Sequence, residues 1–278
     1  MSPDTAPHST QPAPAGAEFA DRTYIVTGGG SGIGRAIALA LAEAGARPVV
    51  AGRTPERLDE TVALIEKAGG SALAVPTDVR DPGAVDALVA AAVEHYGRVD
   101  GLVNNAAGNF VSPGIDLSPN GWRAVVDIVL NGSYYCTRAV ARHLREAGRG
   151  GSILSVIASY AWHGHPGTVH SAAAKAGVLA MTRTLAVELA PLGIRLNCVA
   201  PGPTETEGAG AALWATPEAR AEVLSSVPAG RFAAPSEIAD SALFLLGDRA
   251  SYLTGECLTL DGGQWLGKQI YGRSTANV

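Results

Sequence analysis

The chain has 278 residues, of which 47% are hydrophobic and 17% are charged, and its formal net charge is −5. This length and composition are typical of one large globular domain and argue against a disordered protein. The acidic balance gives no reason to expect nucleic acid or an anionic membrane surface as a partner, and no apolar run approaches the ~20 residues of a membrane span. Three scattered cysteines without metal-ligand spacing are typical of reduced thiols, which favours a cytoplasmic protein.

The first part of the chain, residues 1–20, is rich in proline, alanine, serine and threonine and contains no apolar run. We expect a disordered tail there, followed by one folded domain over residues 21–270. In that domain short apolar runs alternate with longer helical patterns. This alternation predicts an α/β fold, a doubly wound Rossmann domain whose seven-stranded parallel sheet has helices on both faces. The predicted strands are 24–27, 48–51, 72–75, 101–103, 152–157, 194–199 and 257–260, and the predicted helices are 33–44, 55–68, 82–96, 120–146, 171–190 and 236–246.

One stretch, residues 202–230, does not fit this alternation. It begins with several glycines and has only a weakly helical segment near 217–226. An insertion of this kind after the sixth strand is typical of a mobile segment over a binding site. The sequence therefore predicts a substrate lid here.

Glycines mark the link between the first strand and the first helix, where residues 27–34 read Thr-Gly-Gly-Gly-Ser-Gly-Ile-Gly. Gly28 permits a tight turn, Gly32 lets the backbone approach a pyrophosphate, and Gly34 lets the helix and the strand pack closely. The start of the helix also favours phosphate charge. The pattern predicts a dinucleotide site formed by Gly28, Gly30, Ser31, Gly32, Ile33 and Gly34.

The end of the second strand indicates which dinucleotide is bound. An enzyme that uses NAD commonly has an acidic residue there, which binds the ribose hydroxyls. Here the strand ends Ala-Gly-Arg53-Thr, so no carboxylate is present and Arg53 can pair with a 2′-phosphate. A solvated loop arginine is the alternative interpretation, but the missing acid together with Arg53 favours NADPH/NADP+.

The helix predicted over 171–190 begins Ser-Ala-Ala-Ala-Lys, so Ser171 and Lys175 lie four residues apart on one face. The short-chain dehydrogenase/reductase family has Tyr-x-x-x-Lys at this place, and with its glycine turn the chain resembles that family from end to end. The resemblance implies that Lys175 holds the nicotinamide ribose. Ser171 is expected to give only a local hydrogen bond, because a serine hydroxyl is too weak an acid to donate a proton near neutral pH. A second family residue, a serine, is replaced by Ala158.

The same resemblance assigns further residues to the cofactor. Asp78 is similar to the family acid that contacts the adenine, and Asn105 belongs to the Asn-Asn-Ala-Gly motif after the fourth strand. The turn after the sixth strand, with Pro201, Gly202 and Thr204, is similar to the turn on the nicotinamide side.

A narrower resemblance rests on Asn104–Phe110, Asp116–Trp122, Tyr160–Trp162 and His170–Val178. These segments are similar to the NADPH-dependent 2,4-dienoyl-CoA reductases, a branch of the family without flavin or iron–sulfur centres. Reduction of a diene conjugated to a thioester places negative charge on the thioester oxygen. Such a site needs hydrogen-bond donors aimed at that oxygen more than it needs an acid for a carbonyl.

The narrower resemblance implies roles for individual side chains in the reduction of 2,4-dienoyl-CoA to an enoyl-CoA, a step in the β-oxidation of unsaturated fatty acids. Asn109 and Tyr160 would be the donors to the thioester oxygen, and Tyr160 would also be the acid/base residue. Asn131 would organise a water molecule and Lys175. The acyl-CoA substrate would be contacted by Phe110, Ser118 and Arg80, with Arg80 at its phosphates. A core aromatic, a helix cap and a surface arginine are the alternative interpretations of these three residues.

Other functions stay open at this point. A trans-2-enoyl-CoA reductase is the alternative enzyme, because a related branch has also lost the tyrosine, whereas carbonyl reduction by another short-chain reductase is disfavoured by Ser171 and Ala158. A catalytically silent NADP(H)-binding protein is the alternative outside the enzymes, and the presence of Lys175, Asn131 and Tyr160 argues against it.

Two further expectations concern metals and assembly. His163, His165 and His170 lack a carboxylate that would complete an obvious ligand set, so no metal site is predicted. Short-chain reductases usually form tetramers through two long helices. The apolar faces near 124–140 and 172–189 allow this and equally allow an ordinary core, and the resemblance implies a homotetramer.

Overall fold

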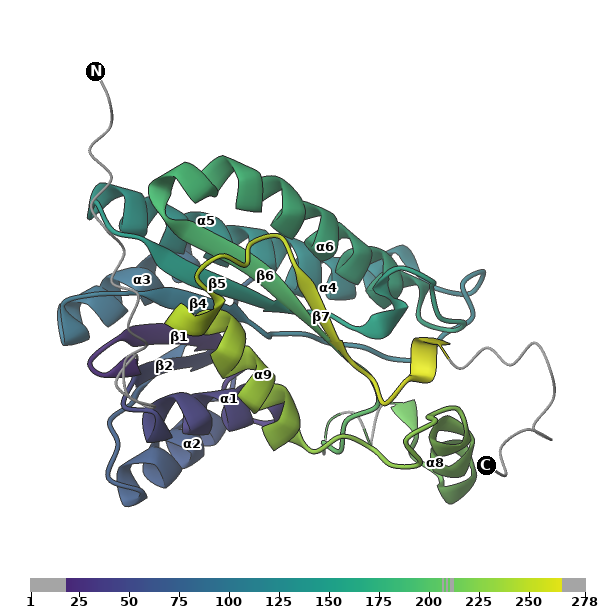
Figure 1. The fold of residues 1–278 in the computed structure, drawn as a ribbon. Coiled ribbons are helices and arrows are strands. Elements are labelled where there is room, and N and C mark those ends of the chain that lie inside the picture. Colours follow the sequence, from purple (N-terminus) through teal and green to yellow (C-terminus); the bar gives the residue numbers. More distant parts are fainter. Residues whose placement is uncertain (1–18, 207, 209, 211–212, 267–278) are drawn as a thin grey trace.

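The protein contains a seven-stranded parallel sheet with the strand order β3-β2-β1-β4-β5-β6-β7, which confirms the predicted fold class (Figure 1). This computed structural model describes residues 19–206, 208, 210 and 213–266. The order reverses between β1 and β4, and in open parallel sheets ligands bind beside such a switch point, at the carboxyl ends of the strands. The strands are β1 (Thr23–Thr27), β2 (Arg47–Gly52), β3 (Leu73–Pro76), β4 (Gly101–Asn104), β5 (Gly151–Val156), β6 (Ile194–Pro201) and β7 (Cys257–Leu260).

Helices cover both faces of the sheet. Helices α1, α2 and α9 pack on one face, and α3, α5 and α6 on the other (Figure 1). Inner strands such as β1 and β4 are buried along their whole length, as expected for a sheet covered on both sides. The α-helices are α1 (Gly32–Glu43), α2 (Pro55–Lys67), α3 (Pro82–Tyr96), α4 (Pro119–Val126), α5 (Gly132–Glu146), α6 (Val169–Leu189), α8 (Pro217–Ser225) and α9 (Pro235–Leu246).

The stretch predicted as one helix over 120–146 differs from the prediction. A π-helical turn, Asp127–Asn131, separates α4 from α5. A single π turn adds one residue without breaking the helical run, so the spacing of apolar residues does not reveal it. Such turns are frequent at functional sites, and this one carries the candidate residue Asn131.

The structure describes only part of the predicted tail, the predicted domain and the predicted lid. Residues 1–18 of the predicted tail, 1–20, and residues 267–270 of the predicted domain lie outside the described part of the chain, while Phe19 is buried against Tyr24. The segment after β6 contains α8, whose first turn is capped by the Thr216 hydroxyl. Among the helices of the described residues, none is both long and apolar enough to cross a membrane.

Candidate active site

The glycine turn after β1 has the geometry of an anion cradle. Gly28 and Gly32 have φ angles of +65° and +52°, which favour glycine. A Cβ atom on Gly34 would lie 2.3 Å from the Gly28 carbonyl oxygen, so only glycine fits the close contact of helix and strand. Ser31 lies at the N-cap of α1, yet its hydroxyl makes no capping bond, and the first helical turn has no acidic residue. The N-terminus of α1 is therefore suited to a phosphate group.

Asn105 supports this turn from behind. Its side-chain amide donates to the carbonyl oxygens of Thr27 (3.0 Å) and Gly28 (3.2 Å). A Cβ atom on Gly34 would also lie 2.4 Å from the same amide nitrogen. Asn105, predicted to bind the cofactor, thus holds the carboxyl end of β4 against the glycine turn.

A pocket beside the glycine turn contains the predicted 2′-phosphate residue, Arg53, and the predicted adenine residue, Asp78. Arg80 donates from Nε to Asp78 Oδ1 at 2.9 Å, and these hydrogen bonds lower the pKa of the Asp78 carboxyl. The structure therefore places Arg80, predicted at the substrate phosphates, next to Asp78 at the edge of this pocket.

Arg57 is a lining residue of the pocket that the sequence interpretation missed. It lies in the first turn of α2, four residues after Arg53, and this spacing around Pro55 was the available signal. Neither guanidinium makes a hydrogen bond or ion pair with any other residue whose position the structure gives. Two arginines and one ion-paired aspartate make the pocket suited to a phosphate ester.

Tyr160 and Ser171 meet at the carboxyl end of β5. Tyr160 lies in a 3₁₀ turn, Ser159–Ala161, and Ser171 lies in the first turn of α6. Their hydroxyl oxygens are 3.0 Å apart. Burial raises the pKa of the Tyr160 hydroxyl, against an opposing contribution from this hydrogen bond, so the phenol keeps its proton at neutral pH. A protonated phenol thus lies beside the Ser171 hydroxyl, and either hydroxyl can be the donor between them.

Lys175 lies one helical turn further along α6 and is almost fully buried. Its ammonium group donates to the carbonyl oxygen of Val156, the last residue of β5, at 2.5 Å. Burial lowers the pKa of this ammonium to about 8. Because an ammonium group has three donors, two remain for ligand hydroxyls.

Asn109 presents its amide nitrogen as a donor. Its side-chain oxygen accepts from the Phe110 backbone N–H at 3.0 Å, and its Nδ2 has no partner among the residues described. The ring of Phe110 also lies near the start of α4, because a Cβ atom on Gly121 would be 3.1 Å from the ring and 3.3 Å from Ser118 Oγ. The structure thus brings Phe110 and Ser118 together at the start of α4, where Ser118 caps the helix.

His170 is a second residue whose place the sequence interpretation missed. Its ring is fully buried and lies 4.5 Å from the ring of Phe110, centre to centre. Burial lowers its pKa, against an opposing contribution from the Phe110 backbone. His170 therefore stays neutral and packs the loop of Asn109 and Phe110 against α6, and its position directly before Ser171 was the only signal.

Asn131 ends the π turn, and its side chain donates to Asp127 Oδ1 at 2.8 Å. The turn packs on the helix of Lys175, because Val129 shares an apolar cluster with Ala174 of α6. Asn131 therefore lies on an element held against α6.

The predicted nicotinamide turn follows β6. Within it, the Thr204 hydroxyl donates to the Gly202 carbonyl oxygen at 3.0 Å, and Pro201 is the last residue of the strand. Two residues later, Thr206 approaches the glycine turn, because a Cβ atom on Gly32 would be 3.3 Å from its methyl group. The segment after β6 thus reaches across to the cradle at α1.

The chain is similar to known proteins over most of its length. A family model described as enoyl-(acyl carrier protein) reductase matches residues 28–264. A protein from Bacillus subtilis (strain 168) named as a probable 2,4-dienoyl-CoA reductase is 49% identical over 246 residues, which cover 88% of this chain and 97% of that protein.

Solved structures are similar over nearly the same range. A short-chain dehydrogenase from Bacillus anthracis has 45% identity and a TM-score of 0.82, covering 91% of this chain and 99% of that one. A structure from Agrobacterium tumefaciens with bound NADP has 36% identity and a TM-score of 0.82, covering 90% and 99% of the two chains. With its parallel sheet and glycine turn, the protein is therefore an oxidoreductase that belongs to the short-chain dehydrogenase/reductase family.

Proposed function

We propose that the protein is an NADPH-dependent 2,4-dienoyl-CoA reductase that acts in the β-oxidation of unsaturated fatty acids. The observation that carries this proposal is the Tyr160 hydroxyl, which lies 3.0 Å from the Ser171 hydroxyl. Ser171 occupies the position where a carbonyl reductase of the family has its tyrosine. The phenol here comes instead from the turn after β5, while Lys175 occupies the family lysine position. The 49% identity to the Bacillus subtilis protein supports the same substrate class.

The proposed mechanism is a hydride transfer followed by protonation of carbon. When bound beside Lys175, NADPH would supply a hydride for a carbon remote from the thioester, and negative charge would then develop on the thioester oxygen. Asn109 Nδ2 and the Tyr160 hydroxyl donate hydrogen bonds to that oxygen and lower the barrier. A proton delivered by Tyr160, or by a water molecule beside Asn131, then completes the enoyl-CoA product.

The residues around the glycine turn fit the cofactor of this proposal. Ser31 and the N-terminus of α1 would take the pyrophosphate, and Lys175 the ribose hydroxyls on the nicotinamide side. Arg53 and Arg57 would pair with the 2′-phosphate, which distinguishes NADPH from NADH.

Replacing Arg53 with alanine should raise the KM for NADPH by roughly tenfold and leave that for NADH almost unchanged, because one charge-assisted hydrogen bond to phosphate is lost. Steady-state rates with both cofactors measure the effect. Arg142→Ala, which removes an exposed arginine of α5, serves as the matched control. A wild-type preference for NADH would contradict the charge argument.

The proposed substrate is tested by following NADPH oxidation with a 2,4-dienoyl-CoA, a trans-2-enoyl-CoA and a 3-oxoacyl-CoA of equal chain length. We expect the dienoyl-CoA to be reduced at least about a hundredfold faster than the 3-oxoacyl-CoA, since the site has donors for an extended enolate. Fastest reduction of the enoyl-CoA would instead support the alternative enzyme, which the enoyl reductase family model favours. No turnover with NADPH bound would support the silent binding protein.

The proposal extends to the lid, the assembly and the compartment. The segment 202–230 would close over the acyl-CoA, because Thr206 already approaches the cofactor turn. A homotetramer through α5 and α6 is supported by exposed apolar side chains such as Tyr134 and Val187. Three cysteines without a disulfide support the cytoplasm as the compartment.

A further inference from the structure

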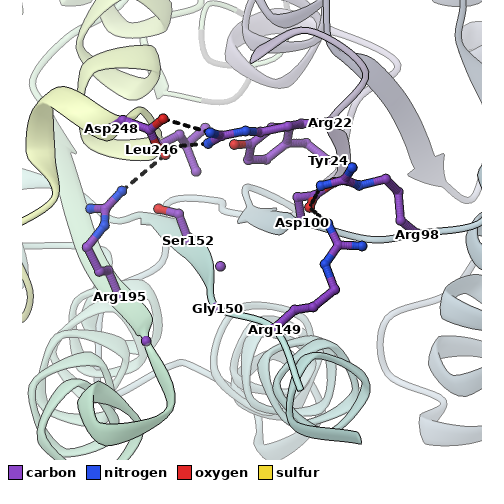
Figure 2. A pocket seen from close by; sticks show the side chains of 12 residues that line it. Arg22, Tyr24, Arg98, Asp100, Arg149, Gly150, Ser152, Arg195, Leu246 and Asp248 are labelled. Carbon is purple, nitrogen blue, oxygen red and sulfur yellow. Dashed lines mark hydrogen bonds and ion pairs between the residues drawn. The ribbon is translucent and has the colours of Figure 1, made fainter. Parts of the chain in front are cut away.

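A second polar pocket lies at the opposite edge of the sheet, where the strands begin (Figure 2). Its volume is about 410 Å³, within the usual range for small-molecule sites. Four arginines and two aspartates line it, an excess of two positive charges in a chain whose net charge is −5. The lining residues used below are Arg22, Arg98, Asp100, Arg149, Arg195 and Asp248. None of them belongs to the candidate active site, which lies at the carboxyl ends of the strands.

Two of the arginines on one side of the pocket have partners that offset their charge. Arg22 forms a bidentate pair with Asp248, with N–O distances of 2.9 and 2.6 Å. Arg195 donates to carbonyl oxygens at the C-terminus of α9, including Leu246 and Gly247. The negative end of the helix dipole and one carboxylate thus compensate this side.

On the other side of the pocket, the positive charge of the arginines is only partly offset. Asp100 is nearly buried and already accepts two hydrogen bonds from Arg98 and one from the Thr23 backbone N–H. Arg149 adds a second cation to the same carboxylate through one contact, from Nη2 at 2.6 Å. Its Nε and Nη1 make no hydrogen bond to another residue in the described part of the chain, and 36% of its side chain is exposed. Arg98, Arg149 and Asp100 together therefore leave one net positive charge on this side of the pocket.

The floor of the pocket is bare backbone. A Cβ atom on Gly150 would lie 2.6 Å from the carbonyl oxygen of Gly193, so the starts of β5 and β6 come together without side chains. The Ser152 hydroxyl lies between the arginines of the two sides (Figure 2). This arrangement leaves room for a small ligand between Arg149 and Arg195.

We propose that this pocket binds a small dianionic oxyanion of the phosphate class, held chiefly by Arg149 and neutralised by the excess of arginine. Arginine suits such a ligand because its planar fork of donors matches the oxygens of a phosphate group. The Ser152 hydroxyl lies beside the arginines and donates to the Leu245 carbonyl oxygen at 3.4 Å. Because the pocket is built from the starts of four strands, an anion bound there joins segments that are distant in the sequence.

The test is the thermal unfolding midpoint of the full chain, measured against inorganic phosphate at constant ionic strength with chloride as the balancing anion. Saturating NADP+ is present, so that phosphate cannot report on the proposed 2′-phosphate site. We expect a saturable rise of the midpoint with phosphate. Arg149→Gln should weaken the apparent phosphate affinity by about tenfold or more, since a charge-assisted contact is lost. Arg142→Gln, which removes the same charge from α5, should keep the affinity of the wild type.

Several results would overturn the proposal: no saturable rise, an equal rise with chloride alone, or equal phosphate affinity in Arg149→Gln. If Arg149→Gln does not fold, Arg149→Lys keeps the charge but loses the fork, and it should bind phosphate more weakly than the wild type. Crystals soaked in tungstate give an independent answer. Anomalous density beside Arg149 supports the site, and density confined to the glycine turn argues against it. Neither measurement depends on turnover, so the proposed enzyme activity is tested separately.

Discussion

Replacing Lys175 with alanine should lower turnover by at least about a hundredfold, whereas Ser171→Ala should lower it by about tenfold or less. The lysine ammonium is anchored to the Val156 carbonyl oxygen at the end of β5, and under the proposed function its other donors hold the nicotinamide ribose. Without it, the nicotinamide ribose would lose the position that the proposed function gives it, and a misplacement of about 1 Å can cost ~10²-fold in rate. Ser171→Ala removes one neutral hydrogen bond to Tyr160, which contributes roughly 0.5–1.5 kcal/mol.

The measurement is the steady-state rate on a 2,4-dienoyl-CoA together with the NADPH dissociation constant. Lys67→Ala is the matched control, because this exposed lysine at the end of α2 is remote from the crevice. Near-UV circular dichroism and thermal unfolding would show whether Lys175→Ala keeps the fold. If the two variants lost activity equally, Ser171 would do more than orient Tyr160, and the interpretation of the Ser-x-x-x-Lys motif would be wrong.

Tyr160→Phe and Asn109→Ala should each lower turnover by roughly 10²–10³-fold while leaving NADPH affinity nearly intact. Each change removes one donor to the thioester oxygen, and the loss of one such donor typically costs about 2.7–4 kcal/mol. Since both donors act on one oxygen, the double variant should lose less than the sum of the two effects.

A matched control for the tyrosine exists at the surface. Tyr96 and Ser71 also have hydroxyl oxygens 3.0 Å apart, far from the crevice, so Tyr96→Phe breaks the same type of hydrogen bond without touching the site. It should retain wild-type turnover. Most of the activity remaining in Tyr160→Phe would mean that this tyrosine is structural, and the proposed substrate class would lose its mechanistic support.

Much of the fold could be predicted because its signals are local. The strand 257–260 is found at its predicted residues, and the glycine turn lies between β1 and α1 as its pattern requires. The break in the helix at Asp127–Asn131 could not be predicted, because apolar spacing is nearly the same through one π turn.

Less of the candidate site than of the fold could be predicted from the sequence. Lys175 and Ser171 share a helix face by spacing alone, but the hydrogen bond between Ser171 and Tyr160 joins elements eleven residues apart through a loop. The packing of His170 on Phe110 likewise depends on how α6 meets the loop after β4. Such contacts arise from tertiary packing, which residue patterns in one chain do not specify.

The π turn also has a consequence for protein engineering. Residues of an α-helix advance by about 100° each, so an extra residue changes the direction of every side chain beyond it relative to the preceding helix. Here the two flanking helices are both fixed, α4 against α6 and α5 against α3. A designer who transplants Asn131 and its Asp127 partner into another scaffold should therefore move the whole five-residue turn, so that the orientation of this pair relative to both flanking helices is kept.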